Sequence, residues 1–251
     1  MSYDIRKQQY NLRKTEVENV AKSKDLENEK ARIALVLDLS GSMSDLYNNG
    51  TVQSVVDRIL PIAVKFDDNA ELDMWVFGKN YSRIDNVTEQ NYLDYVNRKI
   101  VSDKALIQKV DSGGTSYAPA LNDILLRYVK EEPINYSSYV IFITDGENGD
   151  RNEANEIIRT LSKHSIFFQF IGIGNQSFSF LQALDTMTGR FIDNANFFAL
   201  DDLNKISDSE LYNRLLNEYP SWLKEARKKG ILPEIKTNTN SGFNDFLNKF
   251  F

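Results

Sequence analysis

Short apolar runs alternate with amphipathic segments along most of the chain. The runs at 33–37, 72–77, 139–144 and 166–173 lie between polar residues and are typical of strands buried on both faces. Weaker strand patterns follow at 81–84, where we expect an edge strand, and at 197–200. Apolar residues recur at helical spacing in 52–66, 91–99, 118–130, 152–163 and 178–187, with a kink or break expected at Pro61. This alternation predicts an α/β fold, a doubly wound and mostly parallel sheet with helices on both faces.

The two ends of the chain depart from this alternation. We divide the chain into a partly helical N-terminal lead-in at 1–29, a main domain at 30–206, C-terminal helices packing on that domain at 207–230, and a linker with an aromatic tail at 231–251. The lead-in has irregularly spaced apolar positions, which do not predict a long amphipathic helix. Asp208 or Ser209 is the expected cap of the C-terminal helices, and Gly230 is the expected residue after them. The phenylalanines from Phe243 to Phe251 predict either a loosely docked helix or a hook for a partner.

The composition narrows the possible chemistry. The chain has no cysteine and a single histidine, His164, which excludes thiolate metal sites, disulfides and cysteine nucleophiles and leaves almost nothing for histidine chemistry. Any metal must therefore be held by oxygen. A formal net charge of −6 argues against a nucleic-acid-binding surface. No apolar run approaches the roughly 20 residues that span a bilayer, so we expect no membrane span and a cytoplasmic protein; the oligomeric state is left open.

Hydroxyl and carboxylate side chains gather where predicted strands end. Asp38 ends the first strand and is followed by Ser40 and Ser42, Asp145 follows the strand at 139–144, and a Gly-Gly loop leads to Thr115. In doubly wound sheets the ligand site lies outside the carboxyl ends of the strands. Two carboxylates and three hydroxyls suit a hard cation, with Mg²⁺ expected and Mn²⁺ or Ca²⁺ as alternatives.

Two further expectations concern the same loop. The glycine between Ser40 and Ser42 is expected to allow a tight turn, which would point both hydroxyls at one ion. Because serine and threonine oxygens are neutral, such an ion would stay short of negative charge. An anionic ligand from outside the chain would then be favoured.

The pattern Asp38-x-Ser40-x-Ser42 with Thr115 and Asp145 downstream resembles the metal-ion-dependent adhesion site (MIDAS) of von Willebrand factor A (vWA) domains. The surrounding segments ARIALVLDLSGSMSDLY, GGTSYAP and YVIFITDGEN are similar to the type at the TerF C-terminus in the bacterial tellurium-resistance group. The resemblance covers about residues 12–226. It implies a six-stranded, mostly parallel sheet with one short antiparallel edge strand.

The same resemblance implies roles for the site residues. Ser40 and Ser42 would ligate the metal directly, Thr115 would do so in the ligand-competent form, and Asp38 and Asp145 would act largely through bound waters. An acidic group of a protein partner would complete the shell. This implies a non-enzymatic, metal-dependent protein-binding module of a tellurium-resistance or stress-response type of system.

Two other interpretations use the same residues. One is a metal-dependent phosphoesterase in which the cation acts as a Lewis acid, and the other is a metal that only stabilises loops. The sequence offers no general base or nucleophile beside the metal residues, which argues against the phosphoesterase; His164 is expected to close a helix. Glu147, Asp150 and Glu153 predict a solvated loop and a first helical turn, or negative charge at the rim of the metal site.

Overall fold

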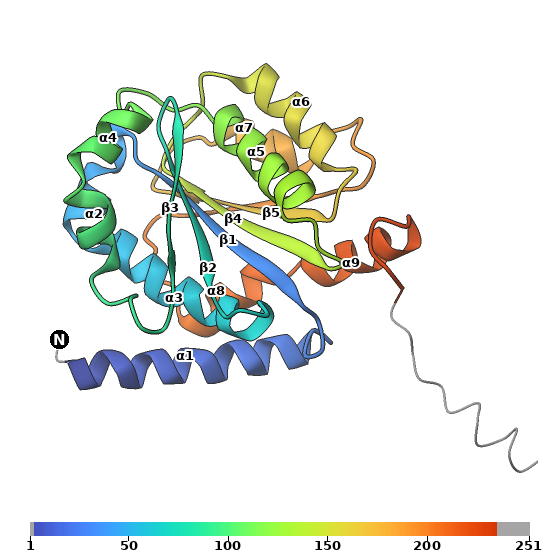
Figure 1. Ribbon diagram of the computed structural model, residues 1–251, viewed down its shortest axis with the longest axis horizontal. Helices are drawn as coiled ribbons and strands as arrows, with labels where there is room; N and C mark the ends of the chain where they lie inside the picture. Colours follow the sequence, from blue (N-terminus) through green and yellow to red (C-terminus); the bar gives the residue numbers. More distant parts are fainter. Residues whose placement is uncertain (1–2, 235–251) are drawn as a thin grey trace, which may run out of the picture.

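A six-stranded sheet runs through the middle of the molecule in the computed structural model, which describes residues 3–234 (Figure 1). The strands are β1 (Ala31–Asp38), β2 (Leu72–Phe77), β3 (Tyr81–Val87), β4 (Ser137–Thr144), β5 (Ile166–Ile173) and β6 (Ala195–Leu200). Their order is β3-β2-β1-β4-β5-β6, and all neighbours are parallel except β3, which pairs antiparallel with β2. The α/β fold class and the antiparallel edge strand are confirmed. The order reverses between β1 and β4, which makes the carboxyl ends of these two strands the expected ligand site.

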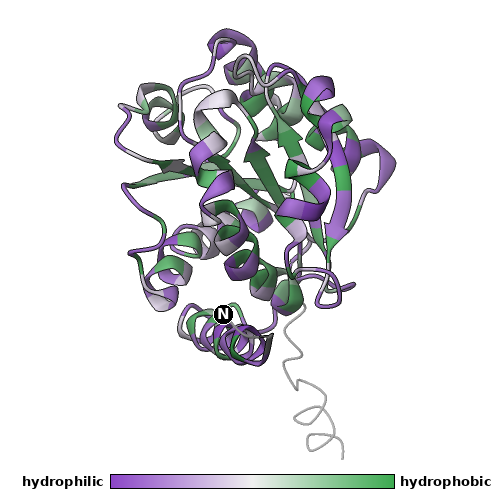
Figure 2. Cartoon of the chain, turned by 90° about the vertical axis from the view of Figure 1, so that its left-hand side faces the viewer, coloured by the Kyte–Doolittle hydropathy of each residue, from purple (hydrophilic) through white to green (hydrophobic). Residues whose placement is uncertain are grey.

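Helices cover both faces of the sheet, which explains the continuous apolar runs. Within the described residues, one face carries α5 (Ala118–Leu125), α6 (Arg151–Leu161) and α7 (Ser179–Asp185), and the other carries α3 (Thr51–Phe66), α8 (Asp208–Leu215) and α9 (Tyr219–Lys228). The colouring in Figure 2 shows the apolar strands between these layers. Every residue of β2, β4 and β5 is buried.

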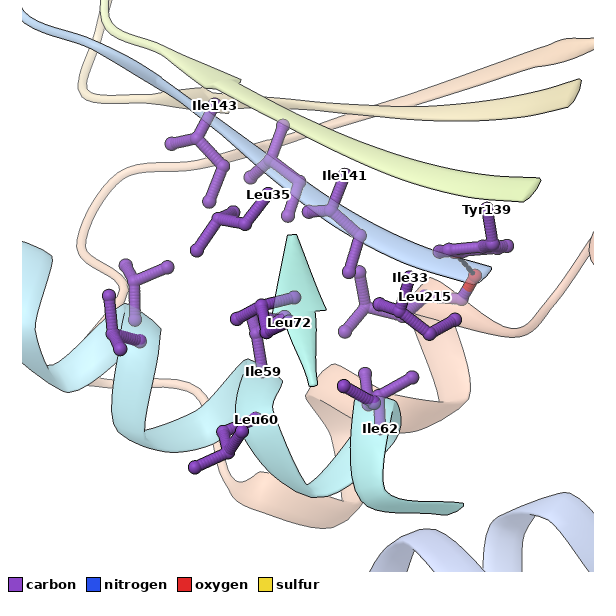
Figure 3. Close-up of a cluster of buried hydrophobic side chains, with 14 of the residues drawn as sticks. Ile33, Leu35, Ile59, Leu60, Ile62, Leu72, Tyr139, Ile141, Ile143 and Leu215 are labelled. Carbon is purple, nitrogen blue, oxygen red and sulfur yellow. Dashed lines mark hydrogen bonds between the residues drawn. The ribbon is translucent and has the colours of Figure 1, made fainter. Parts of the chain in front are cut away.

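Alternate residues of one strand serve the two faces. Ile33 and Leu35 of β1 belong to the core cluster under α3, whereas Ala34 belongs to the cluster under α5. In Figure 3 the side chains of Ile33 and Leu35 lie on the side of the sheet that faces Ile59 and Ile62 of α3. This packing holds the middle of β1 between two apolar layers, and the polar Asp38 stands at its carboxyl end.

The N-terminal segment differs from its prediction. It is one continuous helix, α1 (Tyr3–Ser23), which packs against α3 and α8 as a further layer. Tyr10, Val17 and Val20 are buried at helical spacing, and Leu12 is 65% exposed on the outer side. The outward apolar residues made the spacing look irregular, because they interrupt the pattern of the buried face.

Two predicted helices also have different limits. The region 91–99 starts with turns and becomes helical only from Tyr95, where it runs into the π-helical segment η2 (Asn97–Val101). The helix α4 (Lys104–Val110) follows where no helix is predicted. Asp103 starts α4, since its side chain accepts a hydrogen bond from the Leu106 N–H at 2.9 Å. The predicted helix at 118–130 divides into α5 and the π-helical segment η3 (Leu126–Glu131).

The C-terminal helices agree with the pattern but not with the predicted cap. Ser207 caps α8 by accepting from the Glu210 N–H, and Asp208 pairs instead with Arg13 and Arg58. Gly230 has a positive φ of 73°, as expected after a helix. The phenylalanines from Phe243 to Phe251 lie outside the described residues. No helix within 3–234 is both long enough and apolar enough to cross a membrane.

Candidate metal centre

The two aspartates lie at the ends of neighbouring parallel strands. β1 and β4 pair up to Leu37 and Ile143, so Asp38 and Asp145, which follow, are brought to the same edge of the sheet. The Ser42 hydroxyl donates to Asp145 Oδ1 at 2.9 Å, and the Ser40 and Ser42 hydroxyl oxygens are 3.1 Å apart. Four of the five predicted side chains are therefore gathered at the point where the strand order reverses.

The loop after β1 is shaped by its own hydrogen bonds. Ser40 has an extended backbone, its N–H donates to Asp38 Oδ1 at 2.7 Å, and the short 3-10 turn η1 (Gly41–Met43) and helix α2 (Ser44–Asn48) follow. The expected need for glycine at position 41 is wrong. Gly41 is not among the residues with positive φ, and a Cβ there would meet only the Ser112 carbonyl oxygen, at 3.8 Å. The helical turn alone sets the directions of the two serines.

Thr115 reaches the same edge on a separate loop. Its carbonyl accepts from the Gly149 N–H at 2.9 Å, in the loop that follows Asp145, and the Ser116 N–H donates to the Gly78 carbonyl at 2.8 Å. Among the residues that the structure describes, no hydrogen bond joins the Thr115 hydroxyl to the other four side chains. The Thr115 loop is therefore placed beside the loop that follows Asp145 by backbone hydrogen bonds.

Burial raises the pKa of both carboxyl groups of the candidate site. It raises the pKa of Asp38 to about 6, although Ser40 and the Thr144 hydroxyl, at 2.5 Å from Oδ2, both donate to its carboxylate. Burial also raises the pKa of Asp145, with the Ser42 hydroxyl opposing the shift. Two partly desolvated carboxylates beside each other favour a bound cation.

The donor set is compatible with a small hard cation. Within residues 3–234, no group of three or more His, Cys, Asp or Glu side chains is placed to hold a metal ion. The candidate site instead has two carboxylates and three hydroxyls. Mg²⁺ is commonly held by one or two carboxylates and keeps several waters, so this set matches its preference.

Three supporting residues were not predicted. Thr144 and Tyr47 both hold Asp38. The Thr144 hydroxyl donates to the Asp38 carboxylate, and the Tyr47 hydroxyl donates to the Asp38 backbone carbonyl at 2.9 Å. Tyr117 is fully buried and donates its hydroxyl to the Gly146 carbonyl at 2.7 Å. Thr144 could have been suspected as the last residue of a buried strand. The tyrosines give no such signal, because their contacts exist only in the folded chain.

The acidic residues after Asp145 are more constrained than predicted. Glu147 accepts from the Ser179 N–H and hydroxyl at the start of α7, and Asp150 accepts from the backbone at the start of α5. Neither is simply a solvated loop residue. Glu153 is exposed in the first turn of α6, as predicted. His164 follows α6 and precedes β5, which places it at the amino ends of the strands, opposite the candidate site.

Comparison with known proteins agrees with this architecture. A family model described as "vWA found in TerF C terminus" matches residues 30–232. The chain belongs to this vWA family. The TerF-like vWA chain is 46% identical over 223 residues to the uncharacterized protein YcbR of Bacillus subtilis (strain 168), a match that covers 89% of this chain and 90% of YcbR.

Solved structures resemble the TerF-like vWA chain in fold. Proximal thread matrix protein 1 from the mussel byssus superposes with a TM-score of 0.52 at 17% identity, covering 76% of this chain and 48% of that one. A further structure of that mussel protein has a zinc-occupied MIDAS motif. A von Willebrand factor type A protein from Catenulispora acidiphila gives a TM-score of 0.50 at 13% identity, covering 76% and 43%. The chain thus spans about half the length of these structures.

Proposed function

We propose that this vWA domain is a non-enzymatic protein-binding module whose metal ion recognises an acidic side chain of a partner. The metal would be held by Asp38, Ser40, Ser42, Thr115 and Asp145. The observation that carries the proposal is the Ser42 hydroxyl, which lies 3.1 Å from the Ser40 hydroxyl and 2.9 Å from Asp145 Oδ1, beside the buried Asp38. These side chains already gather around one point.

Charge favours a divalent cation and leaves room for a further anion. Asp38 and Asp145 are destabilised as carboxylates by burial, and a cation would offset this cost. The serine and threonine oxygens add no charge. A carboxylate from a protein partner is a ligand that Mg²⁺ accepts readily, and Mg²⁺ is our proposed ion because small hydroxyl oxygens suit its short bonds. Mn²⁺ and Ca²⁺ are the alternatives.

We propose no catalytic role for these residues. A phosphoesterase would need a general base or a nucleophile beside the metal. The single histidine lies at the opposite edge of the sheet. The hydroxyls of Ser40 and Ser42 are the proposed ligands themselves, and Glu147 is occupied by Ser179.

Metal binding is the first test. Titration calorimetry should give one Mg²⁺ site per wild-type chain, and Ser42→Ala or Asp145→Ala should weaken binding by about 10-fold or more. Asp45→Ala is the matched control, because Asp45 is an exposed acid on the adjacent helix α2 and is outside the proposed ligand set. Its affinity should stay within about 2-fold of wild type. Equal affinities in all four proteins would overturn the proposed site.

Partner capture is the second test. Proteins retained by the immobilised domain in Mg²⁺ should be released by EDTA and should not be retained by Asp145→Ala, whereas Asp45→Ala should retain them. Retention that is insensitive to EDTA and to Asp145→Ala would refute a metal-dependent interaction. If metal removal only lowered the melting temperature, the metal would have a structural role alone.

A further inference from the structure

Backbone hydrogen bonds join the three loops that carry the proposed ligands. The Gly41 N–H, between the two serines, donates to the Ser112 carbonyl at 2.9 Å, in the loop that leads to Thr115. The Gly149 N–H, in the loop after Asp145, donates to the Thr115 carbonyl, also at 2.9 Å. The ligand-bearing loops therefore meet one another directly, in addition to being anchored on separate strands.

Tyr117 holds both ends of the segment that follows Asp145. Its hydroxyl donates to the Gly146 carbonyl at 2.7 Å, and its N–H donates to Asp150 Oδ1 at 3.0 Å. Tyr117 is fully buried and lies two residues after Thr115. A movement of the 146–150 segment would therefore be transmitted to Thr115.

Asp150 is the residue at which these contacts converge. Tyr117 occupies the position before α5 but makes no side-chain cap, so the first N–H groups of that helix need an acceptor from elsewhere. Asp150 supplies it, since its two carboxylate oxygens accept from the Tyr117 N–H and, at 2.7 Å, from the Ala118 N–H. A carboxylate at a helix N-terminus is also favoured by the helix dipole. The Asn148 side-chain amide donates to Asp150 Oδ1 at 2.7 Å and fixes its orientation.

We propose that Asp150 is a positioning residue that sets the distance between Thr115 and Asp145 in the metal centre, an inference that rests on the function proposed above. Its carboxylate belongs to the Asp145 loop and binds the backbone of the Thr115 loop, so the two ligands move as one unit. The centre is then assembled before any partner arrives. Loss of the carboxylate would loosen the connection between the two loops, leaving the Gly149–Thr115 and Tyr117–Gly146 hydrogen bonds, without changing a ligand.

Mg²⁺ and Ca²⁺ should respond differently to that loss. Mg²⁺ requires near-ideal octahedral geometry with short bonds, whereas Ca²⁺ accepts longer and more variable ones. Asp150→Ala should therefore weaken Mg²⁺ binding by about 10- to 100-fold, the usual range for residues that orient metal ligands, and weaken Ca²⁺ binding by less. Asp150→Asn keeps one acceptor oxygen and should give an intermediate loss.

Ser207→Ala provides the matched control. Ser207 caps α8, which is as short as α5, and lies outside the loops of the metal centre. Loss of the Ser207 cap should destabilise the protein as loss of the Asp150 cap does, while the Mg²⁺ affinity stays within about 2-fold of wild type. Calorimetric titrations of Mg²⁺ and Ca²⁺ on folded, full-length proteins measure these differences. If Asp150→Ala does not fold, Tyr117→Phe replaces it. This variant removes the hydroxyl that donates to Gly146 and, at the longer distance of 3.4 Å, to Thr144, and it keeps the Asp150 carboxylate; the expected loss is below about 10-fold and again larger for Mg²⁺.

A double variant tests whether Asp150 acts through Thr115. In a Thr115→Ala background, Asp150→Ala should cost less than about 3-fold, because the ligand that it positions is already absent. The positioning role would be overturned if the loss of affinity in the double variant equalled the product of the losses in the two single variants. Equal losses of Mg²⁺ and Ca²⁺ affinity in Asp150→Ala would also overturn it. Wild-type affinity in Asp150→Ala would do the same while leaving the proposed metal site intact. Absence of binding by the wild type would instead refute the proposed function.

Discussion

Arg58 is a buried cation whose removal should strongly destabilise the domain. It lies on α3 and is only 4% exposed. Its Nε donates to Asp208 Oδ1 at 2.6 Å, and its two terminal nitrogens donate to the Leu203 and Ile206 carbonyls, each at 2.8 Å. One guanidinium therefore ties α3 to the segment between β6 and α8. We propose Arg58→Met as the perturbation, because methionine keeps most of the apolar stem and removes only the charged head.

The expected cost follows from the partners left behind. Each buried carbonyl that loses its donor costs about 1 kcal/mol or more, and breaking a buried ion pair costs about 3–5 kcal/mol. Asp208 is 35% exposed and keeps Arg13 at 3.1 Å, so its own penalty is reduced. We therefore expect about 3 kcal/mol in total, at the lower end of that range. For a chain of this length the melting temperature should fall by roughly 6–12 °C.

Urea unfolding followed by circular dichroism measures this change, with EDTA present so that metal binding does not contribute. The control is Arg214→Met on α8, where the ion pair with Glu210 is exposed and should contribute less than about 1 kcal/mol. The m-value should be unchanged for both variants. If Arg58→Met loses no more stability than Arg214→Met, the guanidinium does not hold the segment before α8 in the way described.

Three further positions, Asp123, Gly172 and Asp67, have partners or neighbours that predict a measurable effect of substitution. Asp123→Asn should lower the unfolding free energy measured in urea by about 3 kcal/mol, because the Asp123 carboxylate accepts from the Trp75 indole at 2.8 Å and from Tyr81 and Arg83 of β3. A loss below about 1 kcal/mol would contradict this. Gly172→Ala should cost about 1–3 kcal/mol in the same assay, because a Cβ would lie 2.7 Å from the Phe178 ring, whereas Gly146→Ala, with no atom within 4 Å, should cost much less. Burial raises the pKa of Asp67 to about 6, so the folded protein binds the proton of this carboxyl group more tightly than the unfolded chain does. The resulting gain in unfolding free energy is fully present below about pH 4 and is lost as the pH rises through about 6. Between pH 4 and 7 the unfolding free energy should therefore fall less in Asp67→Asn than in the wild type, by up to about 3 kcal/mol. Identical pH profiles of the variant and the wild type would refute this assignment.

The sheet could be predicted because its signal is local. Strands covered on both faces are mostly apolar, with few exceptions such as Gln169 in β5, and polar residues follow where the runs end. Asp38 and Asp145 stand at such positions, so their meeting follows from parallel pairing and the reversal of strand order. The distance of Thr115 from these two aspartates could not be predicted in this way, because the Thr115 loop is placed by contacts with Gly78 and Gly149.

The parts that could not be predicted depend on tertiary partners. The sequence around Asp150 is typical of a polar loop, and only the fold reveals that its carboxylate caps α5. The helix α4 has only seven residues, so its apolar positions at Leu106 and Val110 are too few to predict a helix from spacing alone. The ion, the acidic partner, the link to tellurium resistance, the domain limits and the cytoplasmic location stay predictions.

The position of α1 has a practical consequence for anyone who trims the gene. The family match begins at residue 30, so a fragment cut there would look complete by homology. Yet Tyr10, Val17 and Val20 share one apolar cluster with α3 and α8. A fragment without α1 would expose that cluster to water, and we expect it to aggregate or to be degraded rather than to behave as a minimal domain.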